Sequence, residues 1–307
     1  VGDIADLHFS PTKANADNLR REAIMGDIFI TGNTAIDAMQ YTVKPDFVFP
    51  TALLNELDFR NHRIIAVTCH RRENYGKPME AIMHAILEVV ETHPDVEVVY
   101  PVHLSPVVRE CVFPILGGHD RIHLIDPVDV EEMHNLIARC YMVMTDSGGL
   151  QEEAPALGKP VLVMRRETER PEAIAAGTAK LAGVEKDEIV RLAGELLDDP
   201  AAYARMAKAV NPYGDGHASE RIVQAILWHF GRAAEMLGIS QPTLSQQIRM
   251  LEEAVGAPLI NRSNRTMELT PVGRVFAEDA QQILTLMERA KRNAEDILSG
   301  EEAEVKL

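Results

Sequence analysis

The sequence of 307 residues has little cysteine, no excess of positive charge and no long apolar run. Its three cysteines, Cys69, Cys111 and Cys140, lie far apart and form no CxxC pair, so we expect neither a disulfide framework nor a zinc site, as suits a reducing cytoplasm. No apolar run approaches the roughly 18 residues of a membrane span, and no signal peptide is visible. With a formal net charge of −16, the chain repels nucleic acid and anionic membranes on average, so any DNA contact needs a local basic face. We predict a cytoplasmic protein without membrane contact, and we assign it no metal and no cofactor.

Short apolar runs alternate with helical patterns between about residues 27 and 183. A helix is expected at 76–92, where apolar residues recur at helix spacing. Several of the strands are apolar along their whole length, as strands buried on both faces are. Alternating strands and helices predict an α/β fold with a parallel sheet covered on both faces. The expected strands lie at 27–31, 64–68, 96–100, 122–125, 141–145 and 160–164.

The pattern becomes purely helical after residue 184, and the composition changes again near residue 228, where we place a domain boundary. A long helix is expected at about 272–298. Its apolar residues form a heptad seam over about three repeats, which is typical of a coiled coil, so this helix is predicted to join two copies of the chain. The seam comprises Phe276, Ala280, Ile283, Met287, Ala290, Ala294 and Ile297.

A turn of small residues follows the strand expected at 141–145. Residues 146–149 stand between this strand and a helix that begins at Leu150. Unpaired backbone N–H groups and the positive end of the helix dipole favour an anion at such a turn, and glycines let a phosphate approach the backbone. Glu153, in the first turns of the same helix, is placed to accept hydrogen bonds from ribose hydroxyls. The alternative is a glycine-rich helix start that only packs tightly.

Charged residues also follow two other expected strands. His70, Arg71 and Arg72 come directly after one of them, and an imidazole with arginine forks suits a diphosphate. Taken alone, this run is more often a solvated loop. His103 follows the next strand, where a structural role is the alternative, and the turn-rich run at 211–216 is predicted to be a connector. Because these two candidate anion sites are expected at one edge of the same sheet, each supports the interpretation of the other.

Together these runs resemble the non-hydrolysing UDP-N-acetylglucosamine 2-epimerases, over about residues 1–227. The resemblance implies a Rossmann-like parallel sheet that is the C-terminal half of a glycosyltransferase-B-like fold. It also implies an isomerase that inverts C2 of UDP-GlcNAc to give UDP-ManNAc, by elimination and re-addition of UDP. The matching stretches are 30–34, 70–74, 100–103, 145–155, 157–162, 169–172 and 211–216.

The family pattern assigns the UDP contacts to residues of this sequence. Ser147, Gly148 and Gly149 would hold the diphosphate, and Glu153 would hold the ribose. Met133 stands where the family often has an aromatic residue against uracil, so this contact is expected to be weaker or different.

Further positions concern catalysis and regulation. His70 is the candidate catalytic residue, in the active cleft near the diphosphate, and Arg71 and His103 match positions of a second, regulatory UDP-GlcNAc site. Residues 1–26 are interpreted as the remnant of an N-terminal Rossmann-like domain, which in the family supplies the carboxylates for proton transfer at C2. Because abstraction of that proton needs a positioned base and no residue here matches one, we expect binding of UDP or UDP-GlcNAc without unaided turnover.

A second resemblance covers residues 230–270, which are similar to the winged helix-turn-helix of LysR-type regulators. Ser240 is a good N-cap, and Pro242 is tolerated in the first turn of the following helix. The heptad helix then matches the dimerising linker helix of these regulators. The alternative is a helical appendage that does not contact DNA. The residues predicted to contact DNA are Gln241, Pro242, Thr243, Ser245, Gln246, Arg249, Arg262 and Arg265.

Three interpretations of function remain at this stage. The preferred one is the UDP-binding half of an epimerase, because this resemblance covers about three quarters of the chain. The second is a DNA-binding regulator joined to a nucleotide-sugar module, and the third is a chimera without coherent function. The predicted parts are 1–26, the N-terminal remnant; 27–227, the UDP-sugar domain; 228–270, the all-α winged helix-turn-helix; 271–299, the linker helix; and 300–307, an acidic tail.

Overall fold

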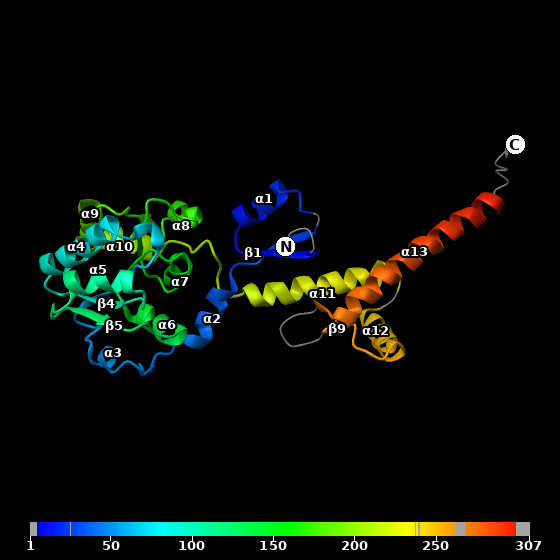
Figure 1. The fold of residues 1–307 in the computed structure, drawn as a ribbon, viewed down its shortest axis with the longest axis horizontal. Coiled ribbons are helices and arrows are strands. Elements are labelled where there is room, and N and C mark those ends of the chain that lie inside the picture. The colour runs from blue at the N-terminus through cyan, green and yellow to red at the C-terminus, as the bar shows by residue number, and fades with distance from the viewer. Residues whose placement is uncertain (1–4, 25, 237, 239, 262–267, 299–307) are drawn as a thin grey trace. The chain divides into compact units, whose positions relative to one another are not determined.

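The structure is a computed structural model that describes residues 5–24, 26–236, 238, 240–261 and 268–298. The chain divides into two compact units, one ending at Ala225 and the other beginning at Ile226 (Figure 1). The predicted α/β region lies in the first unit, and the predicted helix-turn-helix lies in the second. In the described part of the chain, no helix is long and apolar enough to cross a membrane.

A six-stranded sheet forms the centre of the first unit. The strands lie in the order β5-β4-β3-β6-β7-β8, and every adjacent pair is parallel. Successive strands therefore run outward from β3 in one direction and from β6 in the other. In open α/β sheets, such a reversal leaves a ligand crevice at the carboxyl ends of the strands. The strands are β3 (Arg63–Thr68), β4 (Val96–Pro101), β5 (Ile122–Ile125), β6 (Met142–Thr145), β7 (Val161–Val163) and β8 (Ala179–Leu181).

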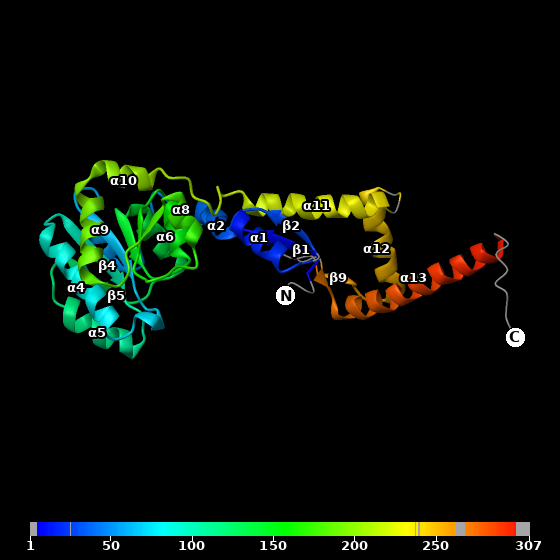
Figure 2. The same cartoon turned by 90° about the horizontal axis from the view of Figure 1, so that it is seen from above.

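Alternate strand residues supply two apolar layers, one on each face of the sheet, and helices lie on both sides of the sheet (Figure 2). Ile65 and Val67 pack on one face, whereas Ile64 and Ala66 pack on the other, because side chains alternate along a strand. The predicted Rossmann-like α/β fold is confirmed. The first face is covered by α4 (Lys77–Thr92), α5 (Pro106–Leu116) and α9 (Lys186–Asp198), which α10 (Pro200–Ala207) follows. The second is covered by α3 (Ala52–Glu56), α6 (Val130–Arg139), α7 (Leu150–Ala156) and α8 (Pro171–Ala176).

A separate two-stranded parallel sheet precedes these elements. It pairs β1 (Leu7–Ser10) with β2 (Asp27–Ile30), and α1 (Lys13–Arg21) connects them. The strand predicted at 27–31 thus forms, but its grouping with the main sheet is wrong, and the division after residue 26 separates two paired strands. An apolar run predicts a strand but does not show which strand it pairs with. The side chains of β2 are mostly half-buried, unlike those of the main-sheet strand β3. α2 (Thr34–Thr42) leads from β2 toward the main sheet.

The regular elements in the described residues of the second unit are helices and one antiparallel pair of short strands. The helix α13 occupies almost the range predicted for the heptad helix. The helix α11 is continuous across the boundary predicted near residue 228, and the two units divide within it, between Ala225 and Ile226. No proline interrupts the run, and an internal glycine only lowers helix stability. The elements are α11 (Ala218–Met236), α12 (Gln241–Val255), β9 (Ile260–Asn261), β10 (Glu268–Leu269) and α13 (Pro271–Leu298).

Candidate functional site

The loops after three neighbouring strands meet at the carboxyl edge of the six-stranded sheet. β3 lies between β4 and β6, so the chain leaves the sheet side by side after Thr68, Pro101 and Thr145. Thr68 and Thr145 are partners in the parallel register, and their hydroxyl oxygens are 2.6 Å apart. The structure thereby brings His70 next to the turn at 146–149, as the sequence predicts.

The side chain of Asp146 ties these loops together. It is fully buried, and its Oδ2 accepts the backbone N–H of His70 at 2.8 Å and that of Arg71 at 2.7 Å. The side-chain amide of Asn74 donates to the same oxygen and to the carbonyl of Met164, which follows β7, both at 3.1 Å. The loops after β3, β6 and β7 are therefore joined at one carboxylate, a role that the sequence did not indicate.

His70 is half-buried between two other groups. Its ring stacks on that of His103, with centroids 5.2 Å apart and planes at 9°. Its Nδ1 lies 3.8 Å from Oδ1 of Asp146. Burial lowers the pKa of His70 below its usual value; Asp146 opposes this effect, and His103 and Arg71 reinforce it. The imidazole is consequently neutral at neutral pH.

Glu169 covers the glycine turn. A Cβ on Gly148 would lie 2.6 Å from Oε1 of Glu169, so this side chain packs directly against the turn's backbone. The carboxylate pairs with Arg71 at 3.4 Å and with Arg165, which also donates to Glu73 at 2.6 Å. Burial raises the pKa of Glu169, but hydrogen bonds from its own backbone and from Arg165 outweigh burial and lower the pKa overall. The turn is thus covered by a charged carboxylate.

The turn leads into α7 through Gly149. The Gly149 carbonyl accepts the N–H groups of Glu152 at 2.9 Å and Glu153 at 3.0 Å, which are the first hydrogen bonds of the helix. The N–H groups from Gly148 to Gln151 precede them and have no partner inside the helix, whereas the N–H of Ser147 donates to the hydroxyl oxygen of Thr145 at 2.9 Å. Since α7 has only seven residues, these local N–H groups and the hydroxyl of Ser147, rather than a long helix dipole, are the donors available to an anion.

Glu153 and Met133 lie on the neighbouring helices α7 and α6. Oε2 of Glu153 is 3.6 Å from Nε2 of His134, and Nδ1 of His134 is 2.7 Å from the hydroxyl of Thr42. Glu153 keeps 20% of its side chain exposed and is therefore accessible to a ligand. Met133 is partly buried against the second apolar layer. His134, whose Nε2 is buried and has no hydrogen-bond partner among the described residues, was not predicted.

The run at 211–216 is docked on the domain rather than a simple connector. The amide of Asn211 donates to the carbonyl of Glu152 at 2.8 Å. Tyr213 is buried, and its hydroxyl donates to Glu172 at 3.2 Å. A hollow of about 490 Å³ lies between this run, α2 and the end of α7.

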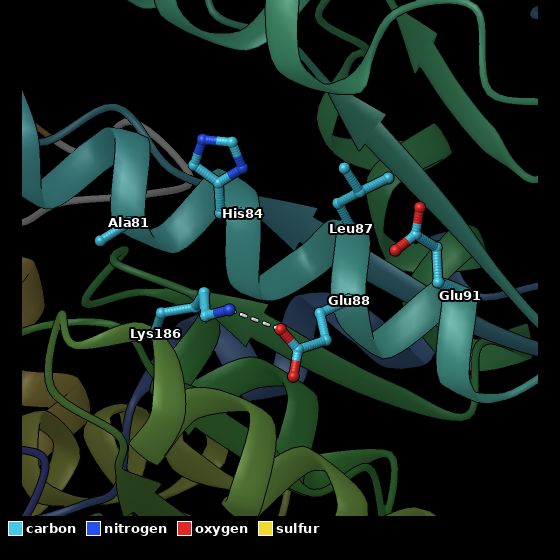
Figure 3. A pocket seen from close by; sticks show the side chains of 6 residues that line it. All are labelled: Ala81, His84, Leu87, Glu88, Glu91 and Lys186. Atoms are coloured by element: carbon cyan, nitrogen blue, oxygen red, sulfur yellow. Dashed lines mark hydrogen bonds and ion pairs between the residues drawn. The ribbon is translucent and has the colours of Figure 1, made fainter.

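Another hollow, of about 460 Å³, lies on the outer side of α4 (Figure 3). All of its lining residues except Lys186 come from α4, and Lys186 donates to Glu88 at 2.6 Å. It shares no residue with the cluster at the sheet edge. Among the described residues, no group of three or more histidine, cysteine or acidic side chains could hold a metal ion.

Comparison with known proteins explains this arrangement. Residues 1–227 match the family model for UDP-N-acetylglucosamine 2-epimerase. The chain belongs to this family. Residues 225–274 also match the family model for bacterial regulatory helix-turn-helix proteins of the LysR family.

The epimerase match extends to individual proteins. A UDP-N-acetylglucosamine 2-epimerase of Bacillus subtilis is 52% identical over 236 residues, which cover 76% of this chain and 61% of that protein. A structure of S. aureus MnaA with UDP has a TM-score of 0.70 and 48% identity, covering 74% of this chain and 62% of that one. A Neisseria meningitidis UDP-GlcNAc 2-epimerase bound to UDP-GlcNAc has a TM-score of 0.66 and 39% identity, covering 73% and 62%. The chain spans about three fifths of the length of the curated relatives it matches.

In this member of the epimerase family, α12 is the predicted recognition helix. It begins after Ser240, whose hydroxyl accepts the Thr243 N–H at 3.3 Å, and it ends at Gly256 in the left-handed conformation. Leu244 and Ile248 are partly buried. The exposed residues among those predicted to contact DNA are Pro242, Thr243, Ser245, Gln246 and Arg249. The side chain of Gln241 and all of Arg262 and Arg265 lie outside the described residues.

Proposed function

We propose that the first unit binds the UDP portion of a UDP-sugar at the carboxyl edge of its sheet. The proposal rests on the contacts through which Asp146 joins His70 and Arg71 to the turn at 147–149. The first 227 residues of the chain also match the epimerase family. The turn's backbone N–H groups and the Ser147 hydroxyl bind the diphosphate, because glycines allow close approach to the backbone. This proposal assigns the binding site to the predicted domain 27–227, whose six-stranded sheet begins at Arg63 and whose first strand, β2, pairs with β1 outside that range.

The remaining UDP contacts come from the helices beside the turn. Glu153 accepts hydrogen bonds from the ribose hydroxyls and lies 3.6 Å from Nε2 of His134. Met133 packs against the uracil as a flexible apolar surface. His70, neutral and half-buried, lies next to the diphosphate and is the candidate catalytic residue.

The family's reaction, inversion at C2 of UDP-GlcNAc through elimination and re-addition of UDP, needs a base at C2. Carboxylates at this edge of the sheet already have partners: Asp146 accepts three donors, Glu169 pairs with Arg71 and Arg165, and Glu152 pairs with Arg170. We therefore infer that this site holds the leaving UDP and that the base is a different group. NMR of UDP-GlcNAc incubated with the chain is expected to give no UDP-ManNAc, and clear turnover would contradict this assignment.

Calorimetric titration with UDP tests the binding site. Gly148→Ala is expected to weaken UDP binding about tenfold or more, because its Cβ would occupy the space where the diphosphate meets the backbone. Gly194→Ala is the matched control, since a Cβ there meets only Asp198, at 3.9 Å. Saturable heat with UDP, little heat with uridine and an unchanged control would support the site. Absence of saturable heat in the wild type would reject it.

We also propose that Arg71 and His103 contact a second, regulatory UDP-GlcNAc. His103 is exposed and stacks on His70, so a ligand bound there would touch the candidate catalytic ring. His103→Ala is expected to abolish a second binding event in the UDP-GlcNAc titration and to leave the first one intact. A single event in the wild type would remove this assignment.

A second function, DNA binding by residues 230–270, is favoured by the LysR match and by the exposed polar face of α12. An exposed arginine on a recognition helix contacts base edges or phosphates. Arg249→Ala is expected to abolish the salt-sensitive gel shift with DNA, whereas Arg289→Ala, the same change of charge on α13, is expected to retain it. Full binding by the Arg249 variant would reject the recognition-helix assignment.

A further inference from the structure

The two oxygens of the Asp146 carboxylate have different surroundings. Oδ2 accepts three hydrogen bonds, from the backbones of His70 and Arg71 and from the side chain of Asn74. Oδ1 is buried and has no hydrogen-bond partner among the described residues. A buried acceptor without a donor is costly, so such an atom in a folded protein calls for an explanation. Nδ1 of His70 lies 3.8 Å from this oxygen.

We propose that Asp146 is a positioning residue for His70, which orients the ring and selects its tautomer through Oδ1. The proposal rests on the assignment of His70 to the UDP site. A small rotation of the ring shortens the separation of 3.8 Å to a hydrogen bond, in which Nδ1–H donates to Oδ1. Nε2 then remains as the nitrogen available to the ligand.

Two contacts restrain the orientation of the His70 ring. His103 stacks against one face of the His70 ring at 5.2 Å, which restrains tilting out of the plane. The His70 backbone is fixed by its N–H donated to Oδ2, so the carboxylate that would receive the ring proton also anchors the residue. The Cys69 thiol also interacts with this carboxylate, but a tie between the loops through Oδ2 does not require Oδ1 to face Nδ1 of His70.

The charge of Asp146 also sets the proton affinity of the ring. Burial lowers the pKa of His70, and Asp146 is the neighbouring group that raises it. A carboxylate that accepts from Nδ1–H stabilises the imidazolium, so replacing it by an amide is expected to lower the pKa of His70 further. The tautomer and the pKa are therefore two independent readouts of one contact.

The test is ¹⁵N NMR of histidine-labelled full-length chain, titrated in pH without and with UDP. In the wild type, neutral His70 is expected to be mainly the Nδ1–H tautomer, more strongly so with UDP. Asp146→Asn retains an oxygen for the three donors and turns its amide N–H toward Nδ1. This variant is expected to shift His70 to the Nε2–H tautomer and to lower its pKa.

Asn74→Ala is the control, because it removes one donor to Oδ2 and leaves Oδ1 unchanged. This variant is expected to keep the wild-type tautomer even if the loop is less stable. A mainly Nε2–H ring in the wild type, or an unchanged tautomer in Asp146→Asn, would overturn the proposal. The measurement without ligand does not depend on UDP binding, so failure of the UDP assignment in calorimetry is distinguished from failure of the positioning role.

Discussion

Replacement of Glu169 by glutamine is expected to tighten UDP binding. Glu169 packs on Gly148 and pairs with Arg71 and Arg165. Its carboxylate therefore lies where a diphosphate would bind and pairs with the arginines that a diphosphate would use. Two unit charges about 5 Å apart in a water-like dielectric repel each other by about 0.8 kcal/mol. Repulsion from two diphosphate charges thus amounts to about 1.6 kcal/mol, which corresponds to roughly a tenfold lower Kd.

The water-like dielectric is appropriate because 38% of the Glu169 side chain is exposed. Calorimetry with UDP at two salt concentrations is the assay, and the gain in affinity is expected to shrink at high salt as the Debye length falls. Glu167→Gln makes the same change of charge two residues away at an exposed position. If Glu169→Gln binds UDP no more tightly than Glu167→Gln, the carboxylate does not compete with the ligand and the reasoning fails.

Three further predictions concern stability and assembly. Burial raises the pKa of Glu97, but hydrogen bonds from His123 and His62 outweigh it and lower the pKa, whereas the pKa of His62 is raised mainly by its bond to Glu97. The contribution of Glu97 to the free energy of unfolding is lost as pH falls below about 4.5, and that of His62 is lost as pH rises above about 6.5. Thermal melts should therefore show the largest loss of stability in Glu97→Gln, relative to wild type, between these two pH values. Asp37 accepts the first N–H groups of α11, so Asp37→Ala is expected to cost about 1–2 kcal/mol in urea unfolding followed by circular dichroism. Burial raises the pKa of Asp37, but these hydrogen bonds lower it overall. The difference in unfolding free energy between the variant and the wild type should therefore vanish as pH falls below about 3.8. The heptad seam predicts a homodimer through α13, so Ile283→Glu is expected to raise the dimer Kd at least about tenfold in analytical ultracentrifugation, because an unpaired carboxylate is costly to bury. A monomeric wild type or an unchanged Kd would contradict the predicted dimer seam.

The main sheet could be predicted because its strands are short, continuous apolar runs. The runs at 64–68 and 96–100 coincide with β3 and β4, since burial on both faces leaves a signal that needs no knowledge of the partner strand. β8 was missed because it has three residues, of which Lys180 is half-buried and Leu181 exposed. β2 was predicted but assigned to the wrong sheet, because pairing with β1 depends on where the chain returns in space.

The candidate site could be predicted only as a set of loops. His70 and the turn at 147–149 follow apolar strands, and parallel strands end at one edge, so their meeting follows from topology. The role of Asp146 could not be predicted, because a buried carboxylate is defined by donors that come from another loop. The same holds for Glu169 over Gly148 and for His134 beside Glu153, the proposed ribose contact, because the members of each pair come from different elements of the fold.

The chain carries a net negative charge, and carboxylates already pair with arginines at the proposed anion site. The arginines near the turn are already paired, Arg71 and Arg165 with Glu169 and Arg170 with Glu152, in a chain of formal net charge −16. At the proposed site, a diphosphate would gain backbone N–H groups of the turn and would replace a carboxylate as the partner of the arginines. Because such binding exchanges one anion for another, the expected affinity depends on the difference between them. A diphosphate offers more acceptor oxygens and more charge than a carboxylate, so the pairing of Glu169 with the arginines is expected to disfavour the binding of anions that carry less charge than UDP.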